Sequence, residues 1–317
     1  MPNALPISAV VATRDRPGPL SRTLASLAEQ EALPAELVLV DASRESRSRE
    51  AAGAFAEGFA RRGCTLSWEE ARVAGAGAQR NQGLARVSQD AVWFFDDDVY
   101  FAPACLKRLA AALQSDRRLG GVSAMIVNQS YGSPGRVSRL LFAVMAGRRL
   151  LSYAGCVVGP AVNFLPEDRD DLPEVVAVEW LNTTCTLYRR EALPNPSFAP
   201  NFDSYSFMED LALSLVVGKS WKLANARRAR IFHDSQPGAH KDNVAARSKK
   251  ELMDRHHIMT RLLGRCGFGD YLRLFLWESF QLAVCAVEKR GGPEFWQALE
   301  GKAAGLRDLC GAAKRGR

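Results

Sequence analysis

With 317 residues, 47% of them hydrophobic and 24% charged, the chain has the composition of a soluble globular protein with one large domain and an appendage, or with two modest domains. Residues 1–20 lack the basic start, apolar run and cleavage site of a signal peptide, and no uninterrupted apolar run of about 18 residues predicts a membrane-spanning helix. Seven scattered cysteines without a CxxC pair favour reduced thiols in the cytosol and argue against a zinc site.

The first half of the chain alternates between strand and helix patterns. Short runs of apolar, β-branched residues predict buried strands, and apolar residues at helical spacing predict helices. Strands are expected at 7–12, 36–43, 64–70, 91–98 and 120–128, and helices at 20–30, 46–62, 75–88 and 103–114. Later elements are an amphipathic helix at 136–151, two short strands within 175–193, a helix from Glu209 closed by Gly218, and helices from 245 onward.

This rhythm predicts an α/β fold with a mostly parallel central sheet and helices on both faces. Right-handed crossovers bring the carboxyl ends of parallel strands to one edge, where ligands bind in open sheets. Thr13, Asp41 and the run Asp96–Asp98 stand at three such ends. We therefore expect one crevice lined by polar residues from three separate loops.

The acidic triplet Asp96, Asp97 and Asp98 is the strongest signal, because it directly follows the apolar run Trp93–Phe95. Side chains of an extended chain alternate, so two of the three carboxylates point the same way and need a cation between them. Hard divalent cations prefer carboxylate oxygens and keep positions open for phosphate. An acidic surface turn is the alternative, and emergence from the core favours a metal site.

Further polar residues allow both functional and structural interpretations. Glu209 and Asp210 open a helix, where acids offset the helix dipole, but they also suit a catalytic role beside the crevice. His233 could complete a metal site with Asp98 or could be structural.

Several other enzyme classes are not supported by the motifs. The stretch GAGAQ lacks both GxGxxG and the lysine of a P-loop, and no GxSxG occurs. In the same region Arg80 and Asn81 could be polar residues of a helix N-terminus, and Asp41 could cap a turn.

The order of motifs resembles the family 2 glycosyltransferases of the GT-A type. The resemblance covers about residues 7–235 and rests on VVATRDRP, ELVLVDAS, AGAQRNQGLARVSQDAVWFFDDDV, WLNTTCTLYRREAL and FMEDLALSLVVGKSWKLANARRARIFH. It implies a GT-A catalytic domain over residues 1–240 and a basic, amphipathic helical extension over 241–317. It also implies inverting transfer of a sugar from a nucleotide-diphosphate sugar to an acceptor hydroxyl, in cell-surface polysaccharide or glycoconjugate assembly.

The resemblance implies a role for each matching residue. The donor side would be formed by Thr13, Asp15, Asp41, Arg80, Asn81, Asp96 and Asp97. The metal, Mn²⁺ or Mg²⁺, would be held by Asp98 with Asp96 and His233. The acceptor side would be formed by Trp180, Asn182 and Thr183, and the general base would be Asp210 or, second, Glu209. The chain departs from the family where Thr13-Arg14-Asp15 replaces the frequent Thr-Tyr-Asn, and where Asn182-Thr183 stands in place of a frequent glycine.

The implied chemistry is consistent with these residue types. A metal would neutralise the charge of the leaving diphosphate, and a carboxylate on the opposite side of the sugar would take the acceptor proton. We expect UDP or dTDP in the donor and a saccharide or lipid-linked saccharide as acceptor. A sugar-nucleotide nucleotidyltransferase and a non-catalytic scaffold that binds sugar nucleotides are the alternatives.

Most of the net charge of +7 lies near the end of the chain, where residues 241–317 hold 15 Lys and Arg against 9 Asp and Glu. Such a segment can meet an anionic membrane or nucleic acid, or can be a solvated helical face. A helix with an apolar face of Leu272, Phe275, Leu276, Leu282 and Val287 can lie in a membrane interface or pack on the domain or a second subunit. We expect a cytoplasmic protein that is peripheral on the inner face of the membrane, with no nucleic-acid partner and a tail that permits a homodimer.

Overall fold

The computed structural model describes residues 3–202, 208–235 and 243–315. The chain forms two compact units, which we name the sheet unit and the helical unit. The sheet unit comprises Met1–Gly132, Ala154–Cys156 and Phe164–Gln236. The helical unit comprises Ser133–Tyr153, Val157–Asn163 and Pro237–Arg317.

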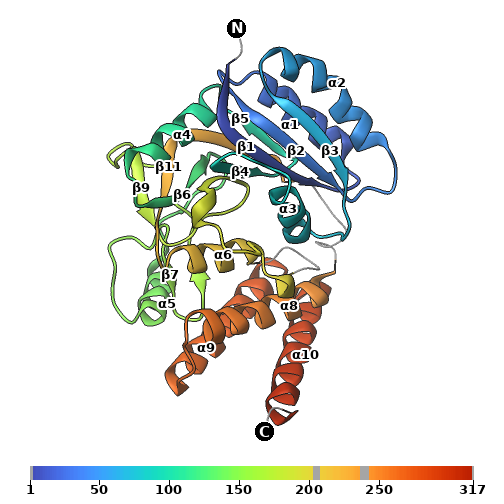
Figure 1. Ribbon diagram of the computed structural model, residues 1–317. Coiled ribbons are helices and arrows are strands. Elements are labelled where there is room, and N and C mark those ends of the chain that lie inside the picture. The colour runs from blue at the N-terminus through green and yellow to red at the C-terminus, as the bar shows by residue number, and fades with distance from the viewer. Residues whose placement is uncertain (1–2, 203–207, 236–242, 316–317) are drawn as a thin grey trace. The chain divides into compact units, whose positions relative to one another are not determined.

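A nine-stranded sheet with the order β3-β2-β1-β4-β10-β6-β11-β5, in which β9 also pairs with β11, forms the centre of the sheet unit (Figure 1). The pairs β3–β2, β2–β1, β1–β4 and β6–β11 are parallel, and β10 lies antiparallel between β4 and β6. The strands are β1 (Ala4–Thr13), β2 (Leu33–Asp41), β3 (Thr65–Glu70), β4 (Ala91–Phe95), β5 (Val99–Phe101), β6 (Leu119–Ile126), β9 (Val175–Val178), β10 (Cys185–Arg189) and β11 (Lys222–His233). The predicted α/β class with a largely parallel centre is confirmed.

Helices cover both faces of this sheet because its central strands are apolar on both sides. In β1, Ala9 and Val11 join the core under α1, α2 and α4, whereas Val10 joins the opposite core with side chains of α3 and α6. The helices are α1 (Pro17–Ala28), α2 (Arg47–Arg61), α3 (Ala76–Leu84), α4 (Cys105–Ser115) and α6 (Glu209–Val217).

Helix α3 approaches the sheet closely because of one glycine and one glutamine. A β-carbon on Gly83 would lie 2.4 Å from Cγ1 of Val10, so only glycine fits there without movement. At the other end of the helix, Gln79 donates from Nε2 to the carbonyl oxygens of Thr13 (2.9 Å) and Val40 (2.7 Å). These contacts join the ends of β1 and β2 and fix the position of the next residue, Arg80.

Strands β5 and β11 were not expected from the sequence. β11 carries several basic residues, which interrupt the apolar pattern of a buried strand. Two of these, Arg227 and Arg230, form ion pairs with Asp168, about 60 residues earlier in the chain. The partner that neutralises these charges is therefore tertiary, and a local pattern does not reveal it.

In its described residues, the helical unit contains four helices of more than ten residues and a short hairpin. These are α5 (Arg136–Ala146), β7 (Val157–Val158), β8 (Val162–Asn163), α8 (Val244–His257), α9 (Phe268–Glu288) and α10 (Pro293–Arg315). Glu278 of α9 is buried and forms ion pairs with Arg255 of α8 and Lys302 of α10, which are buried as well. Among the helices described, none combines the length and the apolar character needed to cross a membrane.

Candidate active site

The predicted strand ends lie at one edge of the sheet. Thr13 ends β1 and pairs in register with Asp41, which ends β2. The acidic triplet follows β4, the other neighbour of β1. The hydroxyl of Thr13 donates a 2.6 Å hydrogen bond to Oδ2 of Asp97, so two of the three loops meet directly.

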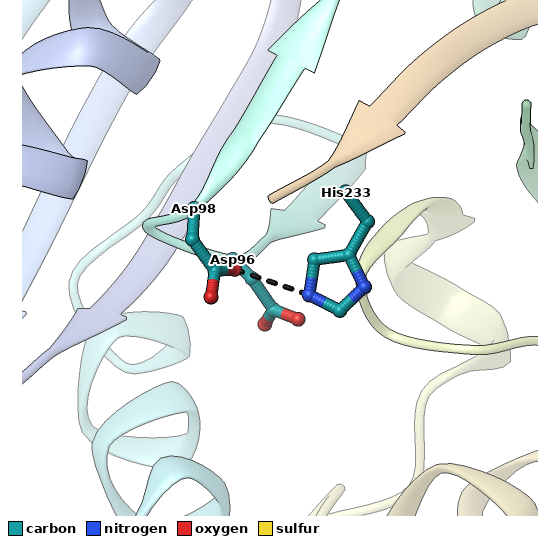
Figure 2. A group of neighbouring side chains, drawn as sticks. All are labelled: Asp96, Asp98 and His233. Carbon is teal, nitrogen blue, oxygen red and sulfur yellow. Dashed lines mark ion pairs between the residues drawn. The ribbon is translucent and has the colours of Figure 1, made fainter. Parts of the chain in front are cut away.

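Asp96, Asp98 and His233 form a group suited to a metal ion, with ligand atoms that all lie within 4.8 Å of one another (Figure 2). His233 ends β11 and pairs in register with Val99, the residue after Asp98. Its Nε2 lies 3.2 Å from Oδ1 of Asp98. Carboxylate oxygens are the ligands that Mn²⁺ and Mg²⁺ prefer, so the two aspartates fit the predicted cation, and the imidazole is a ligand for a transition-metal ion rather than for Mg²⁺.

Contacts with the loop after β6 fix the position of His233. The side chain of Asn128 donates to the carbonyl oxygen of His233 (2.9 Å) and accepts from its backbone N–H (3.0 Å). Nε2 of Gln129 lies 3.2 Å from Nδ1 of the imidazole. Because Gln129 contacts Nδ1, the imidazole directs Nε2 toward Asp98. Metal-ligating histidines are commonly oriented in this way, by a contact at the ring nitrogen that does not bind the metal.

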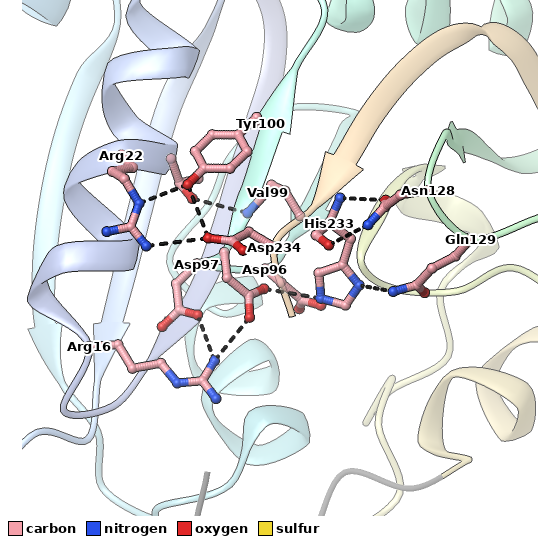
Figure 3. A network of polar contacts seen from close by, with 12 residues as sticks. Arg16, Arg22, Asp96, Asp97, Val99, Tyr100, Asn128, Gln129, His233 and Asp234 are labelled. Carbon is pink, nitrogen blue, oxygen red and sulfur yellow. Dashed lines mark hydrogen bonds and ion pairs between the residues drawn. The ribbon is translucent and has the colours of Figure 1, made fainter. Parts of the chain in front are cut away.

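Arg16, for which the sequence predicted no role, is a central residue of this site (Figure 3). Its Nη1 lies 3.2 Å from Oδ1 of Asp97 and 3.2 Å from Oδ2 of Asp98. Burial raises the pKa of Asp97 to about 6, while the hydrogen bond from Thr13 and the charge of Arg16 act in the opposite direction. An arginine in a loop at the same sheet edge as three acids was the available sequence signal.

Arg80 connects the acidic triplet to the start of α6. Only 4% of it is exposed, and its Nη2 lies 2.7 Å from Oδ1 of Asp96 while its Nη1 lies 3.0 Å from Oε1 of Glu209. The guanidinium also lies 5.5 Å from the ring centroid of Phe198. The first residue of the triplet and the first acid of α6 are therefore joined through one buried cation.

Asp210 differs from its neighbour Glu209 in its contacts. Oδ1 of Asp210 accepts a 2.7 Å hydrogen bond from the backbone N–H of Leu211, at the positive end of the helix. Burial, and after it the charge of Glu209, raise the pKa of Asp210 to about 7. Because Glu209 is paired with Arg80, Asp210 is the carboxyl group of this pair with properties of a proton acceptor at neutral pH.

Three other predicted donor-side residues, Asp41, Asn81 and Asp15, form hydrogen bonds with other residues of the protein. Asp41 accepts hydrogen bonds from the backbone N–H of Ser43 (2.8 Å), from its hydroxyl and from Nε1 of Trp68 (3.1 Å). The Asn81 side chain donates to the carbonyl oxygen of Phe198 (2.7 Å) and accepts from its N–H (3.0 Å). Asp15 has a positive φ of 53° and accepts from the backbone N–H of Arg44 (3.0 Å).

The predicted acceptor residues lie between β9 and β10. Trp180 is buried and donates from Nε1 to the carbonyl oxygen of Phe164 at 2.7 Å. Asn182 and Thr183 are also buried, and within the described part of the chain Oδ1 of Asn182 has no hydrogen-bond partner. Ser214 of α6 joins this segment to the start of α6, since it accepts from the N–H of Leu181 (2.9 Å) and donates to the carbonyl oxygen of Asp210 (2.7 Å).

The fold is of the GT-A type, and solved structures of glycosyltransferases share it. TarS of S. aureus, crystallised with UDP-GlcNAc, aligns with a TM-score of 0.53 and 17% identity over 81% of this chain and 67% of that one. The mannosyltransferase PcManGT from Pyrobaculum calidifontis, in complex with GDP-Man and Mn²⁺, aligns with a TM-score of 0.52 and 16% identity over 98% and 78%. GalNAc-T7 with UDP, GalNAc and Mn²⁺ gives 0.52 and 17% over 73% and 44%.

The family itself follows from the sequence match. Residues 8–193 match the model of Glycosyl transferase family 2, and the chain belongs to this family. None of the curated proteins matches the chain. The family membership favours a glycosyltransferase over the two alternatives, a nucleotidyltransferase and a non-catalytic scaffold.

Proposed function

We propose that this glycosyltransferase transfers a sugar from a nucleotide-diphosphate donor to an acceptor hydroxyl with inversion, using a divalent cation held by Asp98, Asp96 and His233. The observation that carries the proposal is the convergence of these three side chains within 4.8 Å at the carboxyl edge of a parallel sheet. A bound Mn²⁺ or Mg²⁺ would supply neutralising charge to the departing diphosphate. The Mn²⁺ present with PcManGT and with GalNAc-T7 supports a divalent cation.

The donor would lie along the edge formed by Thr13, Asp15, Asp41 and Asp97, with its nucleotide beside the ends of β1 and β2. UDP or dTDP is the proposed nucleotide, and the UDP-sugar bound to TarS supports the former. Further donor-side residues are Asp96, Arg80 and Asn81. Arg80 acts through Asp96, because its guanidinium is buried between two carboxylates. Asn81 acts through the backbone of Phe198.

Asp210 is the proposed general base, and Glu209 is the second candidate. A base near neutral pH should have a pKa close to the working pH, and burial raises that of Asp210 to about 7. Glu209, in contrast, is held in an ion pair with Arg80 and so serves to position the start of α6. Removal of the acceptor proton by Asp210 as the hydroxyl attacks the anomeric carbon gives inversion in a single displacement.

The acceptor would contact Trp180, Asn182 and Thr183. A buried Oδ1 of Asn182 without a partner among the described residues is available to accept a hydrogen bond from a sugar hydroxyl. A saccharide or a lipid-linked saccharide of cell-surface polysaccharide assembly is the proposed acceptor class. Ser214 connects this segment with Asp210, so acceptor contacts and base are held together.

A thermal-shift experiment tests the metal and donor assignment. UDP, dTDP, GDP and CDP are added with and without Mn²⁺ to the wild type and to Asp98→Ala. We expect one nucleotide to raise Tm by several degrees only with Mn²⁺, because a ligand at 100 times its Kd stabilises by about 2.7 kcal/mol. The shift should be lost in Asp98→Ala and kept in Asp171→Ala, which removes an exposed carboxylate. The assignment is wrong if no nucleotide gives a Mn²⁺-dependent shift.

A transfer assay tests the base. With the nucleotide sugar selected by the thermal shifts and an acceptor panel of free and lipid-linked saccharides, Asp210→Asn should lose transfer and keep the nucleotide-dependent shift. Full transfer by Asp210→Asn would remove Asp210 from the mechanism, and loss in Glu209→Gln alone would assign the role to Glu209.

We further propose that the helical unit binds the cytoplasmic face of an anionic membrane. It holds 19 Lys and Arg against 9 Asp and Glu, a net charge of +10 in a chain of +7. On α9, Phe268, Leu272 and Phe275 share one exposed side, and Phe275 is 66% exposed. Exposed apolar side chains beside excess positive charge match the chemistry of an anionic lipid surface.

Vesicle flotation tests this placement. The wild type should float with phosphatidylglycerol vesicles at low salt and not with phosphatidylcholine vesicles, and Phe275→Glu should abolish flotation. Val73→Glu, which alters an exposed apolar residue of the sheet unit, should leave flotation unchanged. A wild type that is dimeric in solution and becomes monomeric in Phe275→Glu, without flotation, would assign the face to a second copy of the chain.

A further inference from the structure

Arg16 is the counter-charge of the two most buried acids of the triplet. Asp97 and Asp98 are 4% and 6% exposed, and a single nitrogen, Nη1 of Arg16, lies 3.2 Å from an oxygen of each. Figure 3 shows the contact of Arg16 with Asp97. Two carboxylates this close to each other are costly without a cation between them. The guanidinium of Arg16 supplies such a cation.

Asp98 is shared between Arg16 and the metal-binding group. Its Oδ2 faces Arg16 at 3.2 Å, and its Oδ1 faces Nε2 of His233 at 3.2 Å. Asp98, one ligand of the proposed metal, is therefore already in contact with a positive charge, the guanidinium of Arg16. A divalent ion that binds Asp98 meets this charge as a repulsion, which weakens binding of the metal alone.

The position of Arg16 allows its side chain to change partners. Its backbone is fixed as the N-cap of α1, where its carbonyl oxygen accepts a 3.1 Å hydrogen bond from the N–H of Leu20. Its side chain is 26% exposed, whereas those of Asp97 and Asp98 are 6% exposed, so the guanidinium lies at the solvent side of the buried acids. A guanidinium binds phosphate oxygens in a planar, two-point contact that a lysine cannot copy.

We propose that Arg16 acts as a resident counter-cation that competes with the divalent ion for Asp98 and is transferred to the diphosphate of the donor when metal and donor bind together. This inference rests on the proposed function. It makes metal and nucleotide diphosphate bind cooperatively, since each ligand relieves a cost that the other would meet alone. Arg16 is a positioning residue in the free protein and a phosphate ligand in the complex.

Manganese binding without nucleotide tests the competition. Mn²⁺ affinity is measured by electron paramagnetic resonance or calorimetry for the wild type, Arg16→Gln and Arg22→Gln. Arg22 is the matched control, because it contacts Tyr100 (2.7 Å) and Asp234 (3.4 Å) on the same side of the site. We expect Arg16→Gln to bind Mn²⁺ about tenfold more tightly and Arg22→Gln to bind as the wild type does, since a unit charge in contact changes the affinity by about a factor of ten even when water screens it.

Arg16→Gln is expected to change the nucleotide affinity in the opposite direction to the Mn²⁺ affinity. With Mn²⁺ at saturation, UDP or dTDP should bind Arg16→Gln about tenfold more weakly than the wild type, because one charge-assisted phosphate contact is lost. Arg16→Lys keeps the charge but not the planar fork, so it should bind Mn²⁺ like the wild type and the nucleotide more weakly. The tighter Mn²⁺ binding combined with weaker nucleotide binding is a pattern that general damage to the site does not produce.

A folding control keeps the test decisive. Arg16→Gln removes the positive charge that lies against two buried carboxylates, so its Tm should be lower than that of the wild type, and Mn²⁺ should raise that Tm by more than it raises the wild-type value. Mn²⁺ binding that is unchanged or weaker in Arg16→Gln would overturn the inference and leave the proposed function standing. Absence of Mn²⁺ binding in both proteins would overturn both.

Discussion

Asp210 is expected to titrate near neutral pH, and removing the charge beside it tests the physical cause. Its pKa is raised to about 7, first by burial and then by Glu209. An aspartate with an ordinary pKa of about 3.9 is protonated in about one molecule in a thousand at pH 7, whereas Asp210 is protonated in about half. Glu209→Gln removes the like charge and leaves Arg80 less compensated. Both effects lower the pKa of Asp210, by on the order of one unit.

Carbon-13 NMR measures this pKa without any substrate. Protein labelled at the aspartate carboxyl carbons is titrated, and Asp210→Asn identifies the signal of Asp210. Where transfer activity has been established, kcat/KM should rise with pH until about pH 7 and then level off, because the base must be deprotonated. In Glu209→Gln both the NMR midpoint and this rise should move to lower pH.

Stability supplies an independent check with a fixed sign. A carboxyl group whose pKa in the folded state exceeds its unfolded value of about 3.9 contributes stability below that value, and the contribution is lost as the pH rises toward the folded pKa. The stability of Asp210→Asn relative to the wild type should therefore increase between about pH 4 and pH 7. An Asp210 signal that titrates near pH 4, or a midpoint near 7 that Glu209→Gln leaves in place, would refute the reasoning.

Two further predictions concern packing and charge away from the chemistry. Gly83→Ala should lower the free energy of unfolding, measured with denaturant, by about 1–3 kcal/mol, because its β-carbon would lie 2.4 Å from a methyl group of Val10. Gly53→Ala on α2 is the control. No atom lies within 4 Å of its β-carbon, so it should raise the free energy of unfolding by up to about 1 kcal/mol. Glu278→Ala removes the carboxylate that pairs with the buried Lys302 and one of the two carboxylates beside the buried Arg255, which keeps Glu251 at 3.5 Å. The loss should cost about 3–5 kcal/mol in the unfolding of the helical unit, followed by circular dichroism, and a cost below about 1 kcal/mol would contradict this.

The central sheet was predictable because its strands are buried on both faces. The strands predicted at 7–12, 36–43 and 91–98 each contain a continuous apolar run and correspond to β1, β2 and β4, and the parallel rhythm placed their polar ends at one edge. The hydrogen bond from Thr13 to Asp97 confirms that these ends meet. Local sequence patterns were sufficient here, because a continuous apolar run is typical of a strand that is buried on both faces of a parallel sheet.

Contacts made by charged residues across long stretches of chain were not predictable. Arg16 and Asp97 are 81 residues apart, and Arg80 and Glu209 are 129 apart. Water can solvate a charged side chain in a loop or at a helix end, so such a side chain needs no partner of opposite charge. Its sequence context therefore does not indicate which opposite charge it contacts in the folded protein. The sequence thus predicted the acidic residues and Arg80 as residues of the site, whereas Arg16, and the acids that each of the two arginines contacts, are found only in the folded protein.

The place of β11 in the sheet affects how the protein is made. β5 follows β4 closely in the sequence, yet its partner in the sheet is β11, which also fills the position beside β6 and ends in His233. β5 ends at Phe101 and β6 at Ile126, whereas β11 begins at Lys222, so during synthesis both strands remain without this partner while about 100 further residues emerge. Exposed strand edges favour association with other chains, so we expect the nascent protein to need chaperones until residue 233 has left the ribosome. A shortened chain that ends at residue 193, the limit of the family match, would lack both this strand and the histidine of the site.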